Sequence, residues 1–521
     1  MRSVVIALAF LGVTNFLKAE GTDIKKVVVI VADDHAMHAT GIYGNDLVKT
    51  PHIDRLANEG VRFDNAFCNS PICSASRQSL LTGKYPIATG VNLLFTPFDD
   101  DNNVTVAEYL KGYGFKTALF GKTHFNNWVW GEMYENYPQH GFDVLREGVA
   151  YKEYYKKLDE KQKQIPEGVL TYEQFKNQGV ANNFNARVLP HAVKDRYSEG
   201  TYVAEQAIQF IEDHKEEDLF VWVAFHQPHH PYYFPIEYQG MYEPADMVLP
   251  ETSAEDDRWV PEKFKNLTLE QRKGIMAAYY TSVSYMDKNI GLVVDAIKEK
   301  GLEDETLIIY LSDNGYLLNH HKRFEKHTMW EEATRQPTIL KHPTMEAKVC
   351  DALIEYVDIA PTIVDCLNLP PMSEAQGKSI LSTIGQNVTA ESEKVFATYL
   401  EDNMAMVRTK KWKYVFTTGS RDLGIGYQTG LGPSGIFHRL YDLENDPKEL
   451  QNLAYNEAYS TTLARMKEEL LEYFSKNHPE ASKCPKGLSM EGKLVWFCEP
   501  RDIGANQGLK PQFDRVFHMN P

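Results

Sequence analysis

The segment Lys25-Lys26-Val27-Val28-Val29-Ile30-Val31-Ala32-Asp33-Asp34 decides the fold of this chain. Its apolar, mostly β-branched residues form a continuous run and do not alternate with polar ones, which is the pattern of a strand buried on both faces. The run ends abruptly in two adjacent carboxylates, Asp33 and Asp34. The segment therefore predicts a central strand whose carboxyl end carries charged side chains.

Three further apolar runs follow the same plan, because each is followed by polar residues that can do chemistry. They are residues 116–120, followed by Lys122 and His124; residues 219–225, followed by His226 and His229; and residues 306–311, followed by Asp313 and Asn314. Helical patterns lie between them, at residues 200–214 and 269–300. Alternating strands and helices predict an α/β fold with a mostly parallel central sheet. Ligands of such folds bind beyond the carboxyl ends of the strands, so the four strand ends predict one shared site.

The character of the sequence changes after about residue 392, where short strand patterns replace the long alternation. These segments are 395–399, 404–408 and 412–416, followed by a glycine-rich stretch at 419–435 and a charged helix at 461–476. We therefore expect a large catalytic domain at residues 20–391 and a smaller C-terminal α+β domain with a short antiparallel sheet at 392–521. Residues 151–193 are rich in Lys, Glu and Tyr without a clear period, and we interpret them as an insertion over one face of the sheet.

The first residues predict a secretory signal peptide at residues 1–19. Arg2 supplies a positive start, and an apolar run from Val4 to Leu17 follows it, too short for a transmembrane span. A buried N-terminal strand is the alternative. No later stretch is long and apolar enough to cross a bilayer, and no cysteine follows the run closely. We therefore expect a secreted or periplasmic protein (lysosomal or extracellular in a eukaryote) without a membrane anchor.

The bulk composition narrows the classes of partner. The formal net charge of −17 argues against binding to nucleic acid or to anionic membranes. The six cysteines are too few for a disulfide scaffold. They are Cys68, Cys73, Cys350, Cys366, Cys484 and Cys498. Cys484 and Cys498 bracket a short loop, and they are the pair that we expect to form a disulfide.

The strongest local signal is Cys73-Ser74-Ala75-Ser76-Arg77, which continues through Leu80, Leu81, Thr82 and Gly83. It resembles the signature of the formylglycine-dependent sulfatases, Cys-x-Pro/Ala-Ser-Arg followed by an apolar pair, Thr and Gly. In that family a formylglycine-generating enzyme oxidises the cysteine, and a hydroxyl of the hydrated aldehyde attacks sulfur. The resemblance implies that Cys73 is the catalytic nucleophile and that Arg77 holds the modified side chain or an oxyanion. An ordinary buried cysteine at a helix start is the alternative.

Two pairs of residues at strand ends form an oxygen-rich set, Asp33 with Asp34 and Asp313 with Asn314. Carboxylate and amide oxygens suit Ca²⁺ and Mg²⁺. The resemblance implies that all four bind one divalent cation and that the modified Cys73 completes the set. We expect calcium, with magnesium as the alternative. Taken singly, each pair is equally typical of a helix cap or a solvated turn.

Basic residues complete the site that the resemblance implies. Gly121-Lys122-Thr123-His124 resembles the family's Gly-Lys-x-His element, so Lys122 is expected to bind sulfate and His124 to act as the base that breaks down the sulfated hydrate. Pro228-His229-His230-Pro231 resembles its Pro-His-x-Pro element, which makes His229 the acid for the leaving alcohol. Two imidazoles suit a reaction in which one step takes a proton and another gives one. For His226 and His230 we favour a structural role.

Lys326 lies four residues before Trp330-Glu331-Glu332 and resembles the family's Lys-x-x-x-aromatic-Glu element, which implies a second sulfate ligand. Asn319 and Lys322 stand where the family usually has glycine, so we expect this loop to differ locally. His321 is expected outside direct contact with the substrate. A solvated charged surface is the alternative interpretation of the basic residues here. Together, these cations would supply the basic pocket that a sulfate-handling protein of such acidic composition needs.

The resemblance extends over nearly the whole mature chain. Its further segments are residues 50–57, 440–443, 446–447 and 452–453. It implies an alkaline phosphatase-like fold and hydrolysis of a sulfate ester. A phosphomonoester or phosphonate hydrolase of the same superfamily is the nearest alternative, and a non-catalytic protein that binds sulfated glycans is another.

The substrate class rests on weaker signals. Export and aromatic residues suited to stacking on sugar rings favour a sulfated carbohydrate. These residues are Trp128, Trp130, Tyr151, Tyr154, Tyr155, Tyr232 and Tyr233, and they are equally compatible with a place in the core. The run from Gly121 to Phe125 and the nearby Gly141-Phe142-Asp143 also resemble choline sulfatases, so a small sulfate ester is the alternative substrate.

Overall fold

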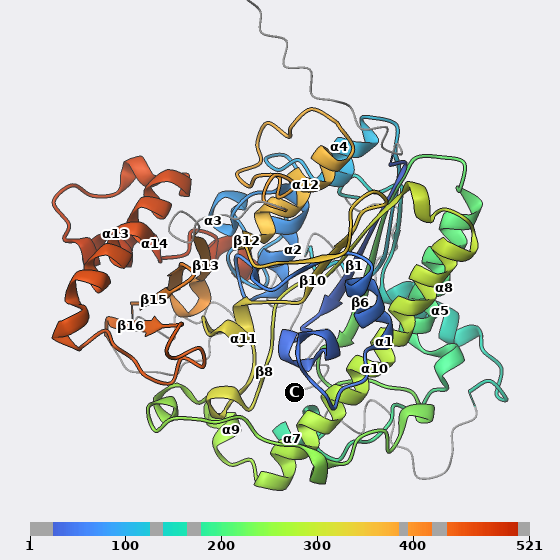
Figure 1. Ribbon diagram of the computed structural model, residues 1–521, viewed down its shortest axis with the longest axis horizontal. Helices are drawn as coiled ribbons and strands as arrows, with labels where there is room; N and C mark the ends of the chain where they lie inside the picture. Colours follow the sequence, from blue (N-terminus) through green and yellow to red (C-terminus); the bar gives the residue numbers. More distant parts are fainter. Residues whose placement is uncertain (1–23, 126–138, 164–178, 385–393, 419–434, 509–521) are drawn as a thin grey trace, which may run out of the picture.

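A central eight-stranded sheet organises the molecule (Figure 1), for which a computed structural model describes residues 24–125, 139–163, 179–384, 394–418 and 435–508. The strand order is β11-β2-β10-β7-β1-β6-β4-β5. The strands are β1 (Lys26–Asp33), β2 (Val61–Phe63), β4 (Lys116–Gly121), β5 (Val144–Arg146), β6 (Leu219–Pro228), β7 (Thr306–Ser312), β10 (Thr338–Lys341) and β11 (Lys348–Cys350). Only β10 runs antiparallel to its neighbours, β7 and β2. The predicted α/β class with a mostly parallel sheet is confirmed.

Strand β1 lies at the centre and is buried on both faces, as its unbroken apolar run predicts. Val28 and Ile30 pack toward helices on one side, and Val27, Val29 and Val31 toward helices on the other. The first layer contains α1 (Pro51–Asn58), α8 (Glu199–Asp213) and α10 (Leu269–Glu299); the second contains α2 (Cys73–Thr82), α4 (Val106–Lys111) and α12 (Ile359–Cys366). Complete burial stabilises each such side chain by roughly 1.5–3 kcal/mol relative to its exposed state.

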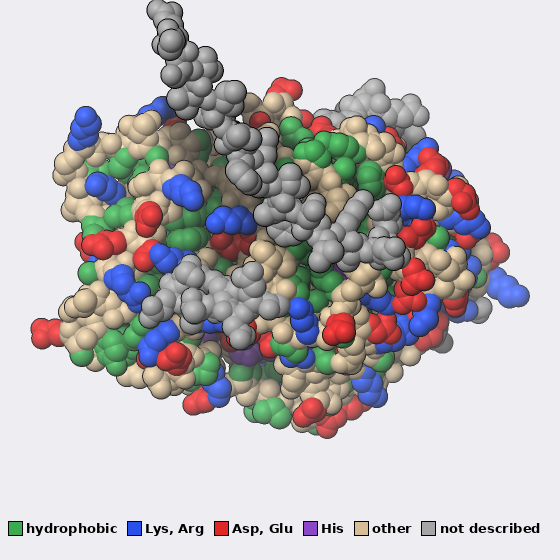
Figure 2. All heavy atoms as spheres, turned by 45° about the horizontal axis from the view of Figure 1, so that its top comes forward, with side chains coloured by type: hydrophobic (Ala, Val, Ile, Leu, Met, Phe, Trp, Pro, Cys, Tyr) green, Lys and Arg blue, Asp and Glu red, His purple; other side chains and the backbone are tan. Residues whose placement is uncertain are grey.

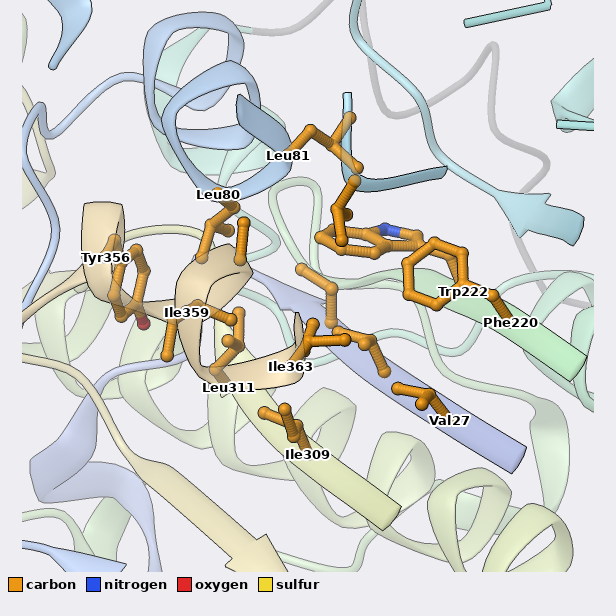
Figure 3. Close-up of a cluster of buried hydrophobic side chains, with 14 of the residues drawn as sticks. Val27, Leu80, Leu81, Phe220, Trp222, Ile309, Leu311, Tyr356, Ile359 and Ile363 are labelled. Atoms are coloured by element: carbon orange, nitrogen blue, oxygen red, sulfur yellow. The ribbon is translucent and has the colours of Figure 1, made fainter. Parts of the chain in front are cut away.

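Figure 3 shows the core between the sheet and the second layer. Leu80 and Leu81 from α2 and Ile359 from α12 meet Val27 and Trp222 of the central strands. Helix α2 is thereby clamped over the sheet, with its first residue, Cys73, at the carboxyl edge of β1. The core therefore sets the position of the cysteine that the sequence singled out.

The segment predicted as an insertion begins as a regular helix, α5 (Gly148–Lys157). Tyr151 and Tyr154 lie one turn apart and pack against Tyr202 of α8, with ring centres 5.8 and 4.8 Å away. The sequence showed no period here because the aromatic residues were mixed with charged ones. Tyr232 is fully buried, so for it the core alternative is confirmed. Trp128 and Trp130 lie outside the described residues.

A smaller four-stranded antiparallel sheet follows, in the order β13-β14-β15-β16. Its strands are β13 (Val395–Tyr399), β14 (Met404–Arg408), β15 (Trp412–Thr417) and β16 (Phe437–Asp442), and its helices are α13 (Ser460–Asn477) and α14 (Met490–Phe497). These helices cover one face of the small sheet, and the other face packs on Phe67, Ile72 and Ala75 of the large domain. The predicted boundary between residues 391 and 392 and the signal peptide at 1–19 lie outside the described residues and stay predictions.

The remaining elements are short. They are α3 (Pro86–Thr89), α7 (Val180–Asn183), α9 (Glu262–Lys265), α11 (Glu331–Thr334) and the strand pairs β3 (Ala66–Phe67) with β12 (Ile354–Glu355) and β8 (Leu317–Leu318) with β9 (Phe324–Glu325). Among the helices of the described ranges, none combines the length and the apolar character that a bilayer crossing requires.

The predicted disulfide between Cys484 and Cys498 is wrong, because all six cysteines are free thiols. Cys498 is fully buried at the end of α14, inside the apolar cluster under the small sheet. Cys484 follows a short 3-10 turn at the margin of that cluster and is only half-buried. Proximity in sequence suggested the pair, but apolar packing accounts for each cysteine separately.

A buried carboxyl group, Glu355, joins the two domains. Its Oε1 accepts hydrogen bonds from Asn69 Nδ2 (2.9 Å) and the backbone N–H of Phe396 on β13 (2.8 Å), and Tyr85 donates to Oε2 (2.7 Å). Burial, with the neighbouring Asp358, raises the pKa of Glu355 from 4.5 to about 8. The folded protein therefore keeps a proton that the unfolded chain loses, so this group's contribution to stability falls as pH rises from about 4.5 to about 8.

We expect Glu355→Gln to reduce this pH dependence. The glutamine oxygen can accept both bonds at Oε1, and its NH₂ can donate to the Tyr85 oxygen once the Tyr85 hydroxyl, which donates to Oε2 in the wild type, turns away. Melting temperatures of both proteins between pH 5 and pH 8 would test this, with the wild type expected to lose more. Equal slopes would contradict the interpretation.

Candidate active site

The polar residues that follow the strands meet at one edge of the sheet, as the α/β pattern predicted. Asp33 ends β1, Asp313 follows β7, Lys122 follows β4 and His229 follows β6. The thiol of Cys73 reaches this group from α2 and lies 3.5 Å from Asp33 Oδ1. Four separate strand ends and one helix start therefore build a single site.

Cys73 stands at the first position of α2, where the backbone N–H groups of the first turn lack helical partners. Its Sγ lies 2.6 Å from Lys326 Nζ and 3.8 Å from Asn314 Nδ2. Burial, only partly opposed by Lys122 and Lys326, raises the pKa of the Cys73 thiol to about 12. The unmodified side chain therefore remains a thiol at neutral pH, and a thiol is a weak nucleophile.

Three carboxylates and the thiol form a cluster that fits a metal ion. One ligand atom from each of Asp33, Asp34, Cys73 and Asp313 lies within 4.8 Å of the others, and all four residues are buried. Asp34 Oδ2 and Asn314 Oδ1 are buried acceptors without a hydrogen-bond partner. Burial, with the like charges of Asp33 and Asp313, raises the pKa of Asp34 to about 7. A divalent cation would satisfy these oxygens and neutralise the repulsion.

Three buried cations surround the carboxylates. Arg77 Nε donates to Asp313 Oδ2 (2.8 Å), Lys122 Nζ donates to Asp33 and Lys326 Nζ to Asp34. Burial alone would raise the pKa of Asp33, but Lys122, His229 and Arg77 outweigh it and hold that pKa well below its usual range. The basic pocket expected from the acidic composition is therefore internal. On the outside, acidic and basic side chains are interspersed over the described surface of the face in Figure 2.

The segment Gly121–His124 is held in an unusual backbone path. Gly121 has φ +96°, and a Cβ there would lie 1.9 Å from the carbonyl oxygen of Ala224. Lys122 N donates to that same oxygen (2.9 Å), and His124 has φ 60°. Only glycine fits the first position, because the strand end approaches β6 so closely. This path turns the side chain of Lys122 toward Asp33.

The two predicted catalytic histidines differ in their contacts. His229 Nδ1 lies 2.7 Å from the carbonyl oxygen of His230, and its Nε2 lies 3.8 Å from Asp34 Oδ2. His124 has a buried Nδ1 without a hydrogen-bond partner. Burial lowers the pKa of both imidazoles well below 6.5. Because Nδ1 of His229 faces the carbonyl of His230, Nε2 is the ring nitrogen that faces the carboxylates.

The neighbouring histidines have contacts that explain their positions without chemistry. His226 Nδ1 lies 3.2 Å from Glu199 Oε1, and His230 stacks on Phe184 at 5.0 Å. His321 hydrogen-bonds to Asp256 (2.8 Å) and stacks on Trp330 at 4.0 Å. Of these three histidines, His230 also has a ring nitrogen within 4.8 Å of an Asp34 carboxylate oxygen.

The loop before Lys326 keeps the left-handed backbone conformation at both positions where glycine was expected. Asn319 has φ 67° and Lys322 has φ 59°. Asparagine tolerates this conformation, whereas lysine does so at an energetic cost. A guanidinium from the neighbouring helix α10 supports this loop, because Arg272 Nη1 donates to Asn319 Oδ1 (2.6 Å) and to the carbonyl oxygen of Lys322 (3.1 Å).

The family is decided by a comparison with family models. The model described as Sulfatase matches residues 25–369, about two thirds of the chain. The chain belongs to the sulfatase family. A second model, N-sulphoglucosamine sulphohydrolase, C-terminal, matches residues 319–476. The sulfatase is therefore a sulfuric ester hydrolase, and its fold is that of the family.

Relatives and solved structures support this placement. The sulfatase is 28% identical over 453 residues to an ulvan-active sulfatase of Formosa agariphila, covering 84% of this chain and 78% of that protein. It is 24% identical over 527 residues to an N-acetylglucosamine-6-O-sulfatase of Bacteroides thetaiotaomicron, covering 92% of each. A phosphonate monoester hydrolase of Agrobacterium radiobacter superposes with a TM-score of 0.71 at 21% identity, covering 90% of this chain and 99% of that one. This last likeness concerns the fold alone.

One residue near the sulfatase site escaped the sequence analysis. Glu147 is buried directly after β5, and its Oε1 accepts hydrogen bonds from the backbone N–H (3.1 Å) and the hydroxyl (2.7 Å) of Thr123. It therefore braces the residue between Lys122 and His124. Glu147 follows a strand, as the predicted site residues do, but β5 has only three residues, too few to reveal a strand in the sequence.

Proposed function

We propose that this sulfatase hydrolyses a sulfate ester on a carbohydrate and that Cys73, converted to formylglycine, supplies the nucleophile. The observation that carries the proposal is the place of Cys73. Its thiol lies between Asp33 and Lys326 at the start of α2, within a buried set of metal-ligand oxygens. A thiol with a pKa of about 12 has little nucleophilic thiolate at neutral pH, which favours a modified side chain.

One divalent cation is assigned to Asp33, Asp34, Asp313 and Asn314, with the modified Cys73 as the fifth contributor. The all-oxygen donor set favours calcium, with magnesium as the alternative. The bound cation would supply positive charge that stabilises the charge developing on the sulfuryl oxygens. The two partnerless oxygens, Asp34 Oδ2 and Asn314 Oδ1, support this assignment.

The modification supplies a carbon that carries two hydroxyls, of which one attacks sulfur and the other allows the enzyme to expel sulfate and recover. A formylglycine-generating enzyme is the maturation partner that this requires. Arg77 keeps Asp313 in place from the next turn of the same helix. Its Nη2 is buried without a hydrogen-bond partner, so it is available to hold the modified side chain.

The remaining residues bind sulfate and move protons. Lys122 and Lys326 hold the sulfuryl oxygens, because both ammonium groups are buried beside the cluster. His229 gives a proton to the leaving alcohol from Nε2, since its Nδ1 is engaged by the carbonyl of His230. Burial lowers the pKa of His229 in the free site, so this role requires the negative charge of the bound sulfate to raise that pKa and protonate Nε2. His124 takes the proton whose removal releases sulfate. We assign no role in binding or proton transfer to His226, His230 or His321.

A sulfated carbohydrate is the proposed substrate class. The relatives named above act on ulvan and on N-acetylglucosamine-6-O-sulfate by their names. The apolar N-terminal run adds support for export, and a secreted or periplasmic enzyme would meet polysaccharides outside the cytoplasm.

Sulfate release measured by ion chromatography would test the substrate class. The protein, co-expressed with a formylglycine-generating enzyme, is incubated with sulfated polysaccharides, their oligosaccharides and choline sulfate. We expect release from a glycan and none from a Cys73→Ala control. Release from choline sulfate alone would contradict the carbohydrate assignment.

Matched aryl sulfate and aryl phosphate esters would test the reaction class. We expect kcat/KM to favour the sulfate. A preference for phosphate by orders of magnitude would place the enzyme with the phosphoester and phosphonate hydrolases of the same fold.

Replacement of Glu147 tests the brace on the Lys122–His124 segment. Glu147→Ala removes the acceptor of both Thr123 hydrogen bonds, and we expect kcat to fall about 10- to 100-fold, since small misplacements of catalytic groups have effects of that order. Glu147→Gln keeps an oxygen acceptor and should retain most activity. Steady-state kinetics of both variants would check this. Equal rates in Glu147→Ala and the wild type would contradict a positioning role.

A further inference from the structure

Two buried arginines converge on the same pair of tryptophans, Trp259 and Trp330. The guanidinium carbon of Arg439 lies 4.4 Å from the Trp259 ring centre and 5.0 Å from that of Trp330. The guanidinium carbon of Arg323 lies 5.9 Å from the Trp330 ring centre, and its Nη1 donates to the carbonyl oxygen of Trp259 (3.2 Å). Arg439 is 1% exposed and Arg323 is 2% exposed, so both positive charges are inside the protein.

Neither arginine has an ion pair with a carboxylate among the residues that the structure describes. Arg439 Nη1 and Nη2 and Arg323 Nε are buried donors without a hydrogen-bond partner. A neighbouring cation of the same small sheet does have carboxylate partners. Lys413 on β15 pairs with Glu331 (3.1 Å) and Glu449 (3.0 Å).

Two unpaired guanidinium groups at this depth are costly. Burying a charge away from water costs free energy unless an opposite charge or hydrogen bonds compensate for it. Arginine keeps its proton in proteins, so it cannot avoid this cost by becoming neutral. Burial, together with the charge of Arg439, lowers the pKa of Arg323 to about 10, against the influence of Glu325 and Asp402. Contact with tryptophan faces stabilises a cation only modestly and does not replace a counter-charge.

We propose that Arg323 and Arg439 bind one oxyanion, a sulfate or carboxylate group, between the C-terminal sheet and the loop that carries Lys326. Three unpartnered N–H-bearing nitrogens from two planar guanidinium groups suit the oxygen atoms of such a group. Arg323 Nη2 also donates to the carbonyl oxygen of Lys326 (3.3 Å), so the proposed anion site lies beside the loop of the catalytic pocket. The anion is either free in solution or a second acidic group of the carbohydrate, and the latter source rests on the proposed function.

Thermal melts with inorganic sulfate test the site. Melting temperatures of the wild type and Arg439→Met are measured in a zwitterionic buffer at increasing sodium sulfate. Both proteins keep the catalytic pocket, so general salt effects and binding there cancel in the difference. We expect a saturable rise of several degrees in the wild type beyond that of Arg439→Met, as for a ligand that binds the folded state.

The behaviour without sulfate is a second readout. Arg439→Met removes an unpaired buried charge, so it should melt at or above the wild-type temperature. Lys413→Met is the matched control, because it removes a paired cation from the same sheet and leaves Glu331 and Glu449 without it. We expect this control to melt lower at every sulfate concentration.

Arg323→Met provides the second variant of the site and should behave like Arg439→Met. Identical sulfate responses in all four proteins, or a lower melting temperature of Arg439→Met throughout, would overturn the proposal.

Kinetics separate the two sources of the anion. With a substrate that carries a second acidic group, Arg439→Met should raise KM about tenfold or more while leaving KM for the singly sulfated analogue unchanged, if the substrate supplies the anion. Unchanged KM for both substrates, with the sulfate response lost, identifies a free anion. Absence of turnover on every ester with an intact sulfate response would contradict the proposed function and leave the anion site standing.

Discussion

Cys73→Ala is expected to lower kcat/KM for sulfate ester hydrolysis by about 10⁴-fold or more, because it removes the proposed attacking group. The loss should be in kcat, since Lys122 and Lys326, the proposed sulfate ligands, remain in place. Sulfate release by the matured wild type and the variant would measure the effect. Peptide mass spectrometry of the wild type should show formylglycine in the peptide that contains Cys73.

Cys366→Ala is the matched control for this prediction. Cys366 is a buried free thiol at the end of α12, in the apolar cluster between α12 and the sheet, and the described contacts do not join it to the site. Its loss should leave kcat unchanged. Full activity of Cys73→Ala would exclude Cys73 as the nucleophile, and activity without formylglycine in the wild type would exclude the modification.

Removal of the divalent cation is expected to lower kcat by about 10³-fold, because several kcal/mol of charge stabilisation are lost from the transition state. It should also lower the melting temperature. Asp33, Asp34 and Asp313 come together within 4.8 Å, and without a cation their repulsion is met only by the surrounding lysines and Arg77. Chelation followed by titration with Ca²⁺ or Mg²⁺ would measure both effects. A cation at about 1,000 times its Kd would add about 4 kcal/mol to the free energy of unfolding.

Asp313→Asn should weaken this response, and Asp287→Asn is its control. Asp287 is also a buried carboxyl group with a pKa raised by burial to about 7, but it accepts hydrogen bonds from the backbone N–H groups of His52 and Ile53. Its replacement should alter stability without altering the response to cation. Full activity after complete chelation would contradict the metal assignment. If Mg²⁺ but not Ca²⁺ restored the activity, the cation would be magnesium and not calcium.

The sequence by itself determined the central sheet and the chemical groups at its edge. A strand buried on both faces requires an unbroken apolar run, so β1, β6 and β7 were visible as such runs, and the polar residues after them had to share one edge because parallel strands end together. The signature around Cys73 and the spacing of Lys122, His124, His229 and Lys326 indicated a sulfatase. Periodicity and local motifs carry this information because they act within one segment.

Only the tertiary structure decided the features that depend on contacts between distant segments. Glu147 became part of the site through Thr123, Cys484 and Cys498 proved to be unpaired, and helix α5 emerged where its tyrosines pack on α8. Arg323 belongs to the basic stretch for which a solvated surface was the alternative, and Arg439 lies far from it in the chain, yet both lie buried against the same tryptophans. The physical reason is that burial and charge compensation depend on which segments meet in space, and a pattern within one segment does not contain that information.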